Sequence, residues 1–305
     1  MSENRRPGSV PPPPAPPPTG TPLSSADGRT PASAPTLFEL REVTRRFHRH
    51  DGSTFTAVNG VSLDIRAGER LGIVGESGSG KSTLVRMMDA VLAPSGGSIT
   101  FRGRSIVGRR DAELADLRSS VSMIFQDPRS SLDPRMRVAD IITEPLRSPV
   151  LRRHLDIRPG ERLAQVLAQV GLPTDAERRY PHEFSGGQRQ RIAIARAIIA
   201  KPEVLIADEA VSSLDVSVRA HVLNLLTELT AEYGLTLIFI SHDLSVVRHV
   251  CDRVVVMRRG DVVEAGLIEQ VYTDPQHPYT RELVASVPRI RLRGGTGRPS
   301  SASQP

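Results

Sequence analysis

The sequence contains a single cysteine and no long apolar run. Cys251 by itself excludes a disulfide framework, and also a zinc or iron–sulfur cage built within this chain, so we expect a small buried hydrophobe in a protein that works in a reducing cytosol. The apolar stretches are only a handful of residues long, whereas about 20 are needed to cross a bilayer. No charged segment followed by an apolar one opens the chain, so we expect no secretory signal.

The distribution of charge excludes a further class of partner. The formal net charge of +6 invites a nucleic-acid interpretation. Residues 1–36 carry a net +1 and residues 289–305 a net +4, which leaves only +1 on residues 37–288. Because the part expected to fold is close to neutral, we predict no nucleic-acid partner. A short basic end is most often a solvated tail, and we assign it no function.

Beyond the amino-terminal stretch, apolar strands and amphipathic helices alternate. Residues 1–36 hold 11 of the 25 prolines without periodicity, which predicts a disordered tail, partly in the polyproline II conformation. The alternation that follows predicts an α/β fold with crossover helices and a mainly parallel sheet, interrupted by a mostly helical insertion. The predicted strands are residues 70–75, 98–101, 121–125, 203–207, 236–240 and 253–257. The predicted helices are residues 81–92, 161–170, 188–200 and 216–232.

One of only two lysines in the chain lies in a glycine-rich segment between a predicted strand and a predicted helix. The segment fits the pattern G-x-x-x-x-G-K-[ST] in the strand–loop–helix context that a phosphate-binding loop requires. Its backbone amides would form an anion nest at a helix N-terminus, Lys81 would reach the β- and γ-phosphates, and Ser82 would ligate Mg²⁺. The predicted nucleoside triphosphate site comprises Gly75, Glu76, Ser77, Gly78, Ser79, Gly80, Lys81, Ser82 and Thr83.

A pair of acids follows the apolar strand predicted at residues 203–207. Asp208 would lie at the carboxyl end of a parallel strand, where α/β sheets bind their ligands, and we expect it to hold Mg²⁺ through water. Glu209 is one residue further and could act as the general base that polarises the attacking water.

A second glycine motif opens the helix predicted at residues 188–200 and places another phosphate-facing helix N-terminus outside the sheet. The segment formed by Ser185, Gly186, Gly187 and Gln188, with the arginines that follow, resembles the signature of ATP-binding-cassette (ABC) ATPases. The other elements of that family occur in order, namely Gln126 after a strand, the acid pair, Asp215 in a Ser-Leu-Asp segment, and His242. The resemblance covers about residues 37–288. It implies a P-loop NTPase of the ABC type, with a mainly parallel sheet core, an antiparallel β subdomain and a helical insertion subdomain.

The resemblance also implies roles for individual residues. In the family two cassettes enclose two ATP molecules, so Ser185, Gly186 and Gln188 would face the γ-phosphate bound by a partner cassette. Gln126 would sense Mg²⁺ and the attacking water and link to the membrane partner, His242 would contact the γ-phosphate, and Asp215 would couple the two sites. Phe47 is the candidate for the aromatic ring stacked on adenine, although tyrosine or tryptophan is commoner there. Phe184 stands where the family usually has leucine.

A narrower resemblance concerns the cargo. Residues 126–135, 180–184 and 274–280 look like the ATPase subunits of dipeptide, oligopeptide and nickel importers, particularly the second of their two ATPases. The segment His277-Pro278-Tyr279 belongs to the carboxyl-terminal extension of that branch, where a proline-fixed turn would pack the tyrosine. The implied organisation is a tail at residues 1–36, an ATPase domain at 37–270 with its insertion at about 130–195, the extension at 271–290 and a basic tail at 291–305.

These features predict an ATPase on the cytoplasmic face of the cell membrane that energises peptide import with ATP and Mg²⁺. The expected partners are transmembrane permease subunits on separate chains, a second ABC ATPase that is either a copy or a paralogue, and indirectly an extracytoplasmic solute-binding protein. Nickel, a sugar or a peptide antibiotic is the alternative cargo. A soluble cassette ATPase of translation or DNA repair and a binding-only subunit remain as rivals, although one cassette, one cysteine and the presence of Lys81, Asp208, Glu209 and His242 disfavour them.

Overall fold

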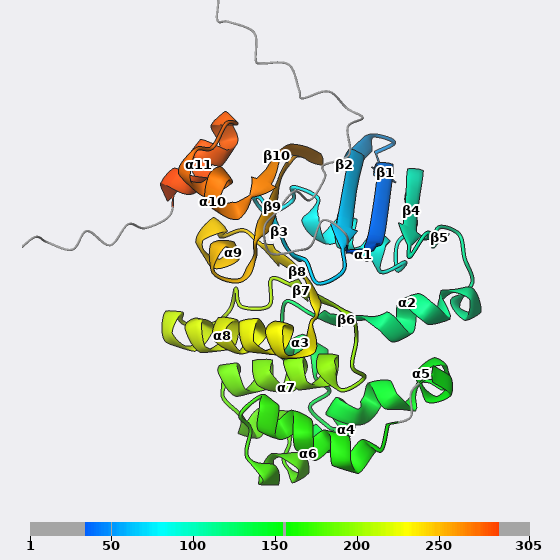
Figure 1. Ribbon diagram of the computed structural model, residues 1–305, viewed down its shortest axis with the longest axis vertical. Helices are drawn as coiled ribbons and strands as arrows, with labels where there is room; N and C mark the ends of the chain where they lie inside the picture. The colour runs from blue at the N-terminus through cyan, green and yellow to red at the C-terminus, as the bar shows by residue number, and fades with distance from the viewer. Residues whose placement is uncertain (1–33, 50, 155–156, 287–305) are drawn as a thin grey trace, which may run out of the picture.

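A small antiparallel sheet covers one side of the molecule. The computed structural model describes residues 34–49, 51–154 and 157–286. Within them the first sheet has the strand order β2-β1-β4-β5, and Figure 1 shows it beside α1. Alternation along β1 buries Phe38, Leu40 and Val43, so one face of the sheet joins the core. The strands are β1 (Thr36–His48), β2 (Thr54–Arg66), β4 (Gly96–Phe101) and β5 (Arg104–Ser105).

A second sheet forms the centre of the fold. Its order in the described chain is β10-β9-β3-β8-β7-β6, and every neighbouring pair is parallel except β10 with β9. Its central strands β3, β7 and β8 are almost entirely buried and mostly apolar, because the antiparallel sheet and α1 cover one face and helices cover the other. The strands are β3 (Arg70–Val74), β6 (Val121–Ile124), β7 (Val204–Asp208), β8 (Thr236–Ser241), β9 (Arg253–Arg258) and β10 (Asp261–Leu267).

Helices follow the strands and also form the predicted insertion. Helices α3 to α7 gather at the end of the molecule remote from the antiparallel sheet, while α10 and α11 lie beside α9 and β10 (Figure 1). The α-helices are α1 (Lys81–Met88), α2 (Ala115–Ser120), α3 (Pro128–Ser131), α4 (Val138–Thr143), α5 (Pro149–His154), α6 (Pro159–Gln169), α7 (Gly186–Ile198), α8 (Val216–Tyr233), α9 (Leu244–Val250), α10 (Ile268–Thr273) and α11 (Pro278–Ser286). Short 3₁₀ turns are η1 (Asp111–Leu114), η2 (Glu144–Arg147), η3 (Thr174–Arg178) and η4 (Pro181–Glu183). No helix in these described ranges is both long and apolar enough to span a membrane.

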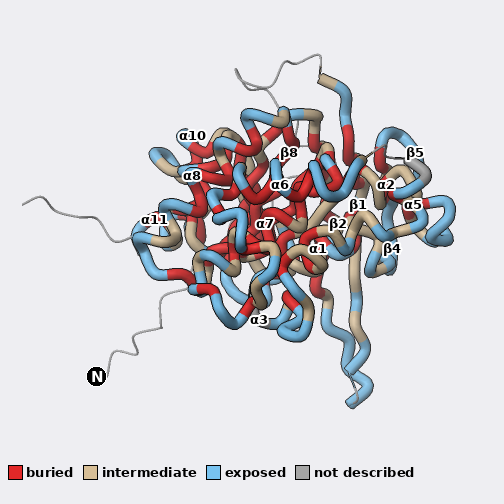
Figure 2. Tube along the Cα trace, turned by 90° about the horizontal axis from the view of Figure 1, so that it is seen from below, coloured by how far each residue is buried: buried red, intermediate tan, exposed pale blue. Residues whose placement is uncertain are grey.

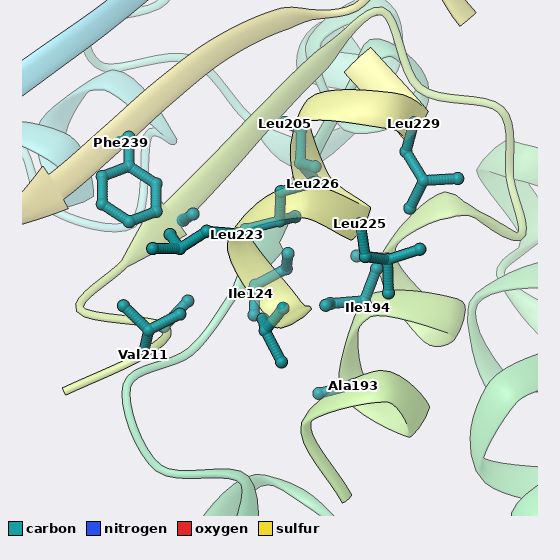
Figure 3. Close-up of a cluster of buried hydrophobic side chains, with 14 of the residues drawn as sticks. Ile124, Ala193, Ile194, Leu205, Val211, Leu223, Leu225, Leu226, Leu229 and Phe239 are labelled. Carbon is teal, nitrogen blue, oxygen red and sulfur yellow. The ribbon is translucent and has the colours of Figure 1, made fainter. Parts of the chain in front are cut away.

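The sheet separates two apolar clusters. One lies between the parallel and antiparallel sheets, and the other joins the opposite face of the parallel sheet to the helical insertion. Figure 3 shows side chains of α7, α8 and the neighbouring strands meeting in the second cluster, among them Ile194, Leu226 and Phe239. Buried residues fill the interior along α7 and β8, and exposed ones lie at the periphery (Figure 2). Cys251 is buried in the second cluster as predicted, and burial raises the pKa of its thiol.

The mainly parallel α/β fold predicted from the sequence is confirmed, with corrections to some element bounds. The helix predicted at residues 81–92 ends at Met88, because Ala90 takes a left-handed conformation with φ of 51°. The helix predicted at 188–200 runs from Gly186 to Ile198 because Ser185 caps it two residues earlier. Strand β1 begins at the last residue of the predicted tail. Residues 1–33 of that tail, and the basic tail at 291–305, lie outside the described residues.

One glycine fixes how closely helix α9 packs on the strand that leads to the phosphate loop. A Cβ at Gly72 of β3 would lie 2.1 Å from Cγ1 of Val247, which is buried in α9. A Gly72→Ala substitution is therefore expected to lower the free energy of unfolding by about 1–3 kcal/mol, measured by urea denaturation, because buried groups must shift. Gly160→Ala is the matched control: nothing lies within 4 Å of its Cβ, and the change should be neutral or slightly stabilising. Equal effects of the two substitutions would contradict this account of α9 packing.

Candidate functional site

The phosphate loop connects β3 to α1 through backbone that only glycine can occupy. Gly80 has φ of 105° and immediately precedes α1, and a Cβ there would lie 2.2 Å from the carbonyl oxygen of Ala57. Gly75 has φ of 155°, and a Cβ there would lie 2.1 Å from the carbonyl oxygen of Met257. The loop is thus pressed against β2 and β9, and its amides precede a helix N-terminus, which favours anions.

Lys81 is buried at the base of this loop. Its side chain donates hydrogen bonds to the carbonyl oxygens of Gly75 at 2.7 Å and Glu76 at 2.9 Å. Burial lowers the pKa of the Lys81 ammonium, while the charges of Glu209, Asp208 and Glu76 oppose that shift. The ammonium is therefore held by weak neutral acceptors, which a phosphate group could replace.

Asp208 and Ser82 meet beside the loop. Asp208 is the last residue of β7, and its Oδ1 accepts a hydrogen bond from the Ser82 hydroxyl at 3.1 Å. Burial raises the pKa of the Asp208 carboxyl, and the Ser82 hydrogen bond partly offsets it. A hydroxyl and a carboxylate are both oxygen donors of the kind that Mg²⁺ takes.

Glu209 contacts two of the other predicted residues. Its Oε2 accepts a hydrogen bond from Nε2 of Gln126 at 2.9 Å and lies 3.7 Å from Nδ1 of His242. Its backbone has φ of 46°, a left-handed conformation that is uncommon for glutamate, and its amide donates to the carbonyl oxygen of Ile240 at 3.0 Å. The backbone thus holds the carboxylate in place after the strand has ended.

Many of these groups line one open cavity of about 580 Å³ at the carboxyl ends of β3, β6, β7 and β8, but Gly75, Ser79 and Asp208 are not among its lining residues. The phosphate loop supplies most of its wall, and Glu209 faces the loop from β7 with its two neighbours. The structure therefore brings together residues that are spread over about half of the chain. The lining residues are Glu76, Ser77, Gly78, Gly80, Lys81, Ser82, Thr83, Gln126, Glu209 and His242.

The signature residues lie elsewhere, at the start of α7. The Ser185 hydroxyl accepts the amide of Gln188 at 3.3 Å, and Oε1 of Gln188 accepts the amide of Ser185 at 3.0 Å, a reciprocal cap of the helix. A Cβ at Gly187 would lie 2.3 Å from Cγ1 of Val218, so α7 and α8 are in close contact there. Ser185, Gly186 and Gln188 are exposed, and none of them is among the cavity residues described above.

Phe47 and Asp215 also lie outside the cavity lining. Phe47 pairs with Phe55 across β1 and β2, and the Arg45 guanidinium lies 4.7 Å from its ring centroid. Asp215 caps α8 by accepting the amide of Val218 at 2.9 Å. Phe184 is buried, with the Arg179 guanidinium 4.3 Å from its ring.

Sequence reasoning missed one contact of the loop. The amide of Glu76 donates a hydrogen bond to the hydroxyl of Tyr279 at 2.9 Å. The sequence predicts this tyrosine only as a packing residue of the expected carboxyl-terminal extension. The available sequence signal was the segment His277-Pro278-Tyr279, but nothing local connects it to a loop about 200 residues earlier.

A strand–phosphate loop–helix unit that faces an acid pair on the same sheet edge defines a nucleotide-hydrolysing protein of the P-loop class. The comparison with known families is more specific. The model of the family described as "ABC transporter" matches residues 58–212, about half of the chain. The chain belongs to this family of ATP-binding-cassette proteins, and it is an ATPase subunit by that membership.

Curated relatives support the family at high identity. The oligopeptide transport ATP-binding protein OppF of Salmonella typhimurium is 48% identical over 253 residues, which cover 82% of this chain and 75% of OppF. The dipeptide transport ATP-binding protein DppF of Lactococcus lactis is 46% identical over 256 residues, covering 83% of this chain and 81% of DppF.

Solved structures agree on the fold. The ATP-binding cassette MJ0796, described as a dimer in a post-hydrolysis state bound to ADP and Pi, is similar with a TM-score of 0.67 at 26% identity. That similarity covers 76% of this chain and 99% of MJ0796. Likewise cbiO1 of Clostridium perfringens, described as part of the ABC transporter complex cbiONQ, has a TM-score of 0.67 at 29% identity, covering 84% of this chain and 97% of cbiO1.

The two lysines of the chain provide a matched test of the phosphate loop. Lys81→Met is expected to weaken ATP binding about 10- to 100-fold, because a charge-assisted hydrogen bond to phosphate is lost. Lys201→Met removes the same group from an exposed position at the opposite end of β7 and should leave the affinity unchanged. Calorimetric titration with ATP measures both. Unchanged binding by the Lys81 variant would remove this loop from the nucleotide site.

Proposed function

We propose that this chain is the ATP-hydrolysing subunit of an importer of short peptides at the cytoplasmic face of the cell membrane. The observation that carries the catalytic part is the contact of Glu209 with Gln126 and His242 at the mouth of the phosphate loop. The names of the relatives, which are oligopeptide and dipeptide transport proteins, support peptides as the cargo. The importer-type segments at residues 126–135 and 274–280 support the same cargo.

Nucleotide binding follows from the loop. The amides of residues 75–83 and the N-terminus of α1 would hold the phosphates, and Lys81 would exchange its two carbonyl partners for the β- and γ-phosphates. The hydrogen bonds of the Lys81 ammonium would become stronger, because two anionic phosphates would replace two neutral carbonyl oxygens as acceptors. Phe47 is proposed as the ring that stacks on adenine, although it lies outside the cavity lining in this structure.

The residues beside the loop fit Mg²⁺. The Ser82 hydroxyl donates a hydrogen bond to the Asp208 carboxylate, and Gln126, which lines the cavity together with Ser82, carries an amide oxygen. Such a small set of oxygens suits an ion that takes its other ligands from phosphates and water. When bound, Mg²⁺ would neutralise charge that develops on the phosphates. Ser82 and Asp208 would hold the ion, and Gln126 would complete the set.

Glu209 is proposed as the general base. Its carboxylate would accept a proton from the water that attacks the γ-phosphate. Gln126 donates a hydrogen bond to Oε2 of this carboxylate and so orients it. The imidazole of His242, whose Nδ1 is 3.7 Å from the same oxygen, would contact the γ-phosphate. Because the protein does little covalent chemistry in phosphoryl transfer, this positioning is the main contribution of the three side chains.

A second cassette would complete the site. Ser185, Gly186 and Gln188 are exposed at a helix N-terminus, which suits them to a phosphate bound by a partner. The solved dimer of MJ0796 supports this arrangement. Cδ2 of Leu214 lies 3.9 Å from the Cβ position of Gly186, so Asp215, the next residue, adjoins the signature and is proposed to couple the two sites. The partner cassette is either a paralogue or a second copy.

Permease subunits are proposed to dock on the helical insertion. Phe125 is 49% exposed immediately before Gln126, so an apolar contact there would adjoin the catalytic site. A groove of about 420 Å³ lies between the insertion helices and has both apolar and basic walls. An extracytoplasmic solute-binding protein would deliver the cargo to the permease. The groove is lined by Thr143, Leu146, Arg147, Leu151, Arg152, Ile157 and Pro159.

The transport assignment is tested by uptake in the native organism. Deletion of the gene for this chain should abolish uptake of a radiolabelled tripeptide, and the wild-type chain, but not Glu209→Gln, should restore it. Uptake of the corresponding free amino acid serves as the control and should not change. Unchanged tripeptide uptake together with lost ⁶³Ni²⁺ uptake would contradict peptide as the cargo while leaving the ATPase chemistry intact.

Glu209→Gln separates binding from hydrolysis in vitro. The variant should bind ATP normally but hydrolyse it about 10²- to 10⁴-fold more slowly, because the amide cannot accept the proton of water. Glu203→Gln is the matched control, since it lies next to the opposite end of β7 and pairs with Arg102 at the surface. Phosphate release by the assembled transporter is the measurement. Near-normal hydrolysis by the Glu209 variant would exclude Glu209 as the base.

A further inference from the structure

The carboxyl-terminal helix α11 places a tyrosine hydroxyl against the phosphate loop. Tyr279 is the second residue of α11, and it is only 1% exposed. Its hydroxyl oxygen accepts the backbone N–H of Glu76 at 2.9 Å. The guanidinium of Arg258, the last residue of β9, lies 4.7 Å from the centre of the ring. Burial of the ring and its contact with Arg258 thus fix the direction in which this acceptor points.

The hydrogen bond falls on a peptide group that is held from two sides. The carbonyl of Gly75 and the N–H of Glu76 belong to one peptide unit and point in opposite directions. Lys81 donates to that carbonyl at 2.7 Å, and Tyr279 accepts from that N–H. The orientation of the first peptide of the loop is therefore set by one residue of the loop and one residue of the extension.

The start of α11 is itself anchored. The carboxylate of Glu264 on β10 accepts the backbone amides of Gln276 at 2.8 Å and His277 at 3.0 Å. The imidazole Nδ1 of His277 accepts the amide of Tyr279 at 3.2 Å. These contacts connect the turn before Tyr279 to β10 of the central sheet. The position of the tyrosine hydroxyl is therefore fixed by a hydrogen-bonded turn.

We propose that Tyr279 is a positioning residue for the phosphate loop, which makes the carboxyl-terminal extension a part of the nucleotide site. The inference rests on the proposed binding of ATP. A loop rich in glycine has many conformations to lose when it closes on a phosphate, so anchoring it beforehand lowers the entropy lost on binding. Tyr279 itself touches the back of the loop and does not line the cavity.

Tyr279→Phe keeps the ring and removes the acceptor. The affinity of the full chain for ATP, measured calorimetrically, should fall about 3- to 10-fold, as expected for one hydrogen bond. The affinity for ADP should fall by the same factor, because the loop amides hold phosphates that both nucleotides carry. In the assembled transporter KM for ATP should rise while kcat changes less than about twofold, since Glu209 and its neighbours are untouched.

Two further variants keep the test interpretable. Tyr272→Phe is the matched control, because this tyrosine lies on α10 and also has an arginine, Arg248, at 4.3 Å from its ring. Removal of its hydroxyl should leave the affinities for ATP and ADP unchanged. Glu264→Ala keeps the Tyr279 side chain but removes the carboxylate that anchors the start of α11. This variant should lower the affinities for both ATP and ADP. Thermal unfolding without nucleotide verifies that each variant is folded.

The outcomes separate the inference from the function on which it rests. Unchanged ATP and ADP affinities in folded Tyr279→Phe would overturn the positioning role, and so would an equal loss in Tyr272→Phe or a fall in kcat at constant KM. A wild-type chain that binds neither nucleotide would instead refute the proposed function.

Discussion

The site depends on the parallel register of four strands. Val74 of β3 pairs with Ser241 of β8, Asp208 of β7 pairs with Ile240 of β8, and Ile124 of β6 pairs with Ala207 of β7. Because these strands run in one direction and end almost level, the residues that follow them meet at one edge. A slip of β7 by one residue would turn Asp208 to the opposite face and remove Glu209 from the cavity. The buried Val, Leu and Ile side chains on both faces fix the register of these strands. They therefore also fix where the residues that follow the strands lie in the candidate site.

Within that frame, unfavourable groups compensate one another. Burial disfavours the charged forms of Lys81 and Asp208, and the opposite charge of each group partly offsets this effect of burial on the other. The left-handed backbone of Glu209 is held by the hydrogen bond that its amide donates to the carbonyl oxygen of Ile240. Since a nucleotide would bring negative charge to Lys81, binding would relieve part of this electrostatic cost. The sheet thus holds Lys81, Asp208 and Glu209 in a preorganised arrangement that these side chains would not keep without it.

Sequence reasoning reaches furthest where a motif is local. The phosphate loop and the acid pair are contiguous motifs, and the residues that line the cavity are all among the site residues that the sequence predicts, whose roles stay predictions. The predicted end of the helix at residue 92 was wrong, because apolar residues continue the helical period through Val91. In the structure α1 ends at Met88, and Val91 is 68% exposed. Contacts across the fold could not be predicted. The hydrogen bond between Gln126 and Glu209 depends on the pairing of β6 with β7. The hydrogen bond between Glu76 and Tyr279 depends on the packing of α11.

The phosphate loop shows why such distant contacts matter. Its glycines give it close approach to Ala57 and Met257, but they also deprive it of side chains that could hold it in shape. The surrounding fold supplies what is missing: the amide of Gly260 donates to the carbonyl of Ser79 at 3.0 Å, and Tyr279 accepts from Glu76. Both come from the chain after β9, which is remote from the loop in sequence. By thermodynamic reciprocity, a segment that stabilises the binding form of the loop is itself stabilised by the nucleotide. The carboxyl-terminal segment and the nucleotide would then stabilise each other, so that a segment about 200 residues from the loop in sequence would contribute to nucleotide binding.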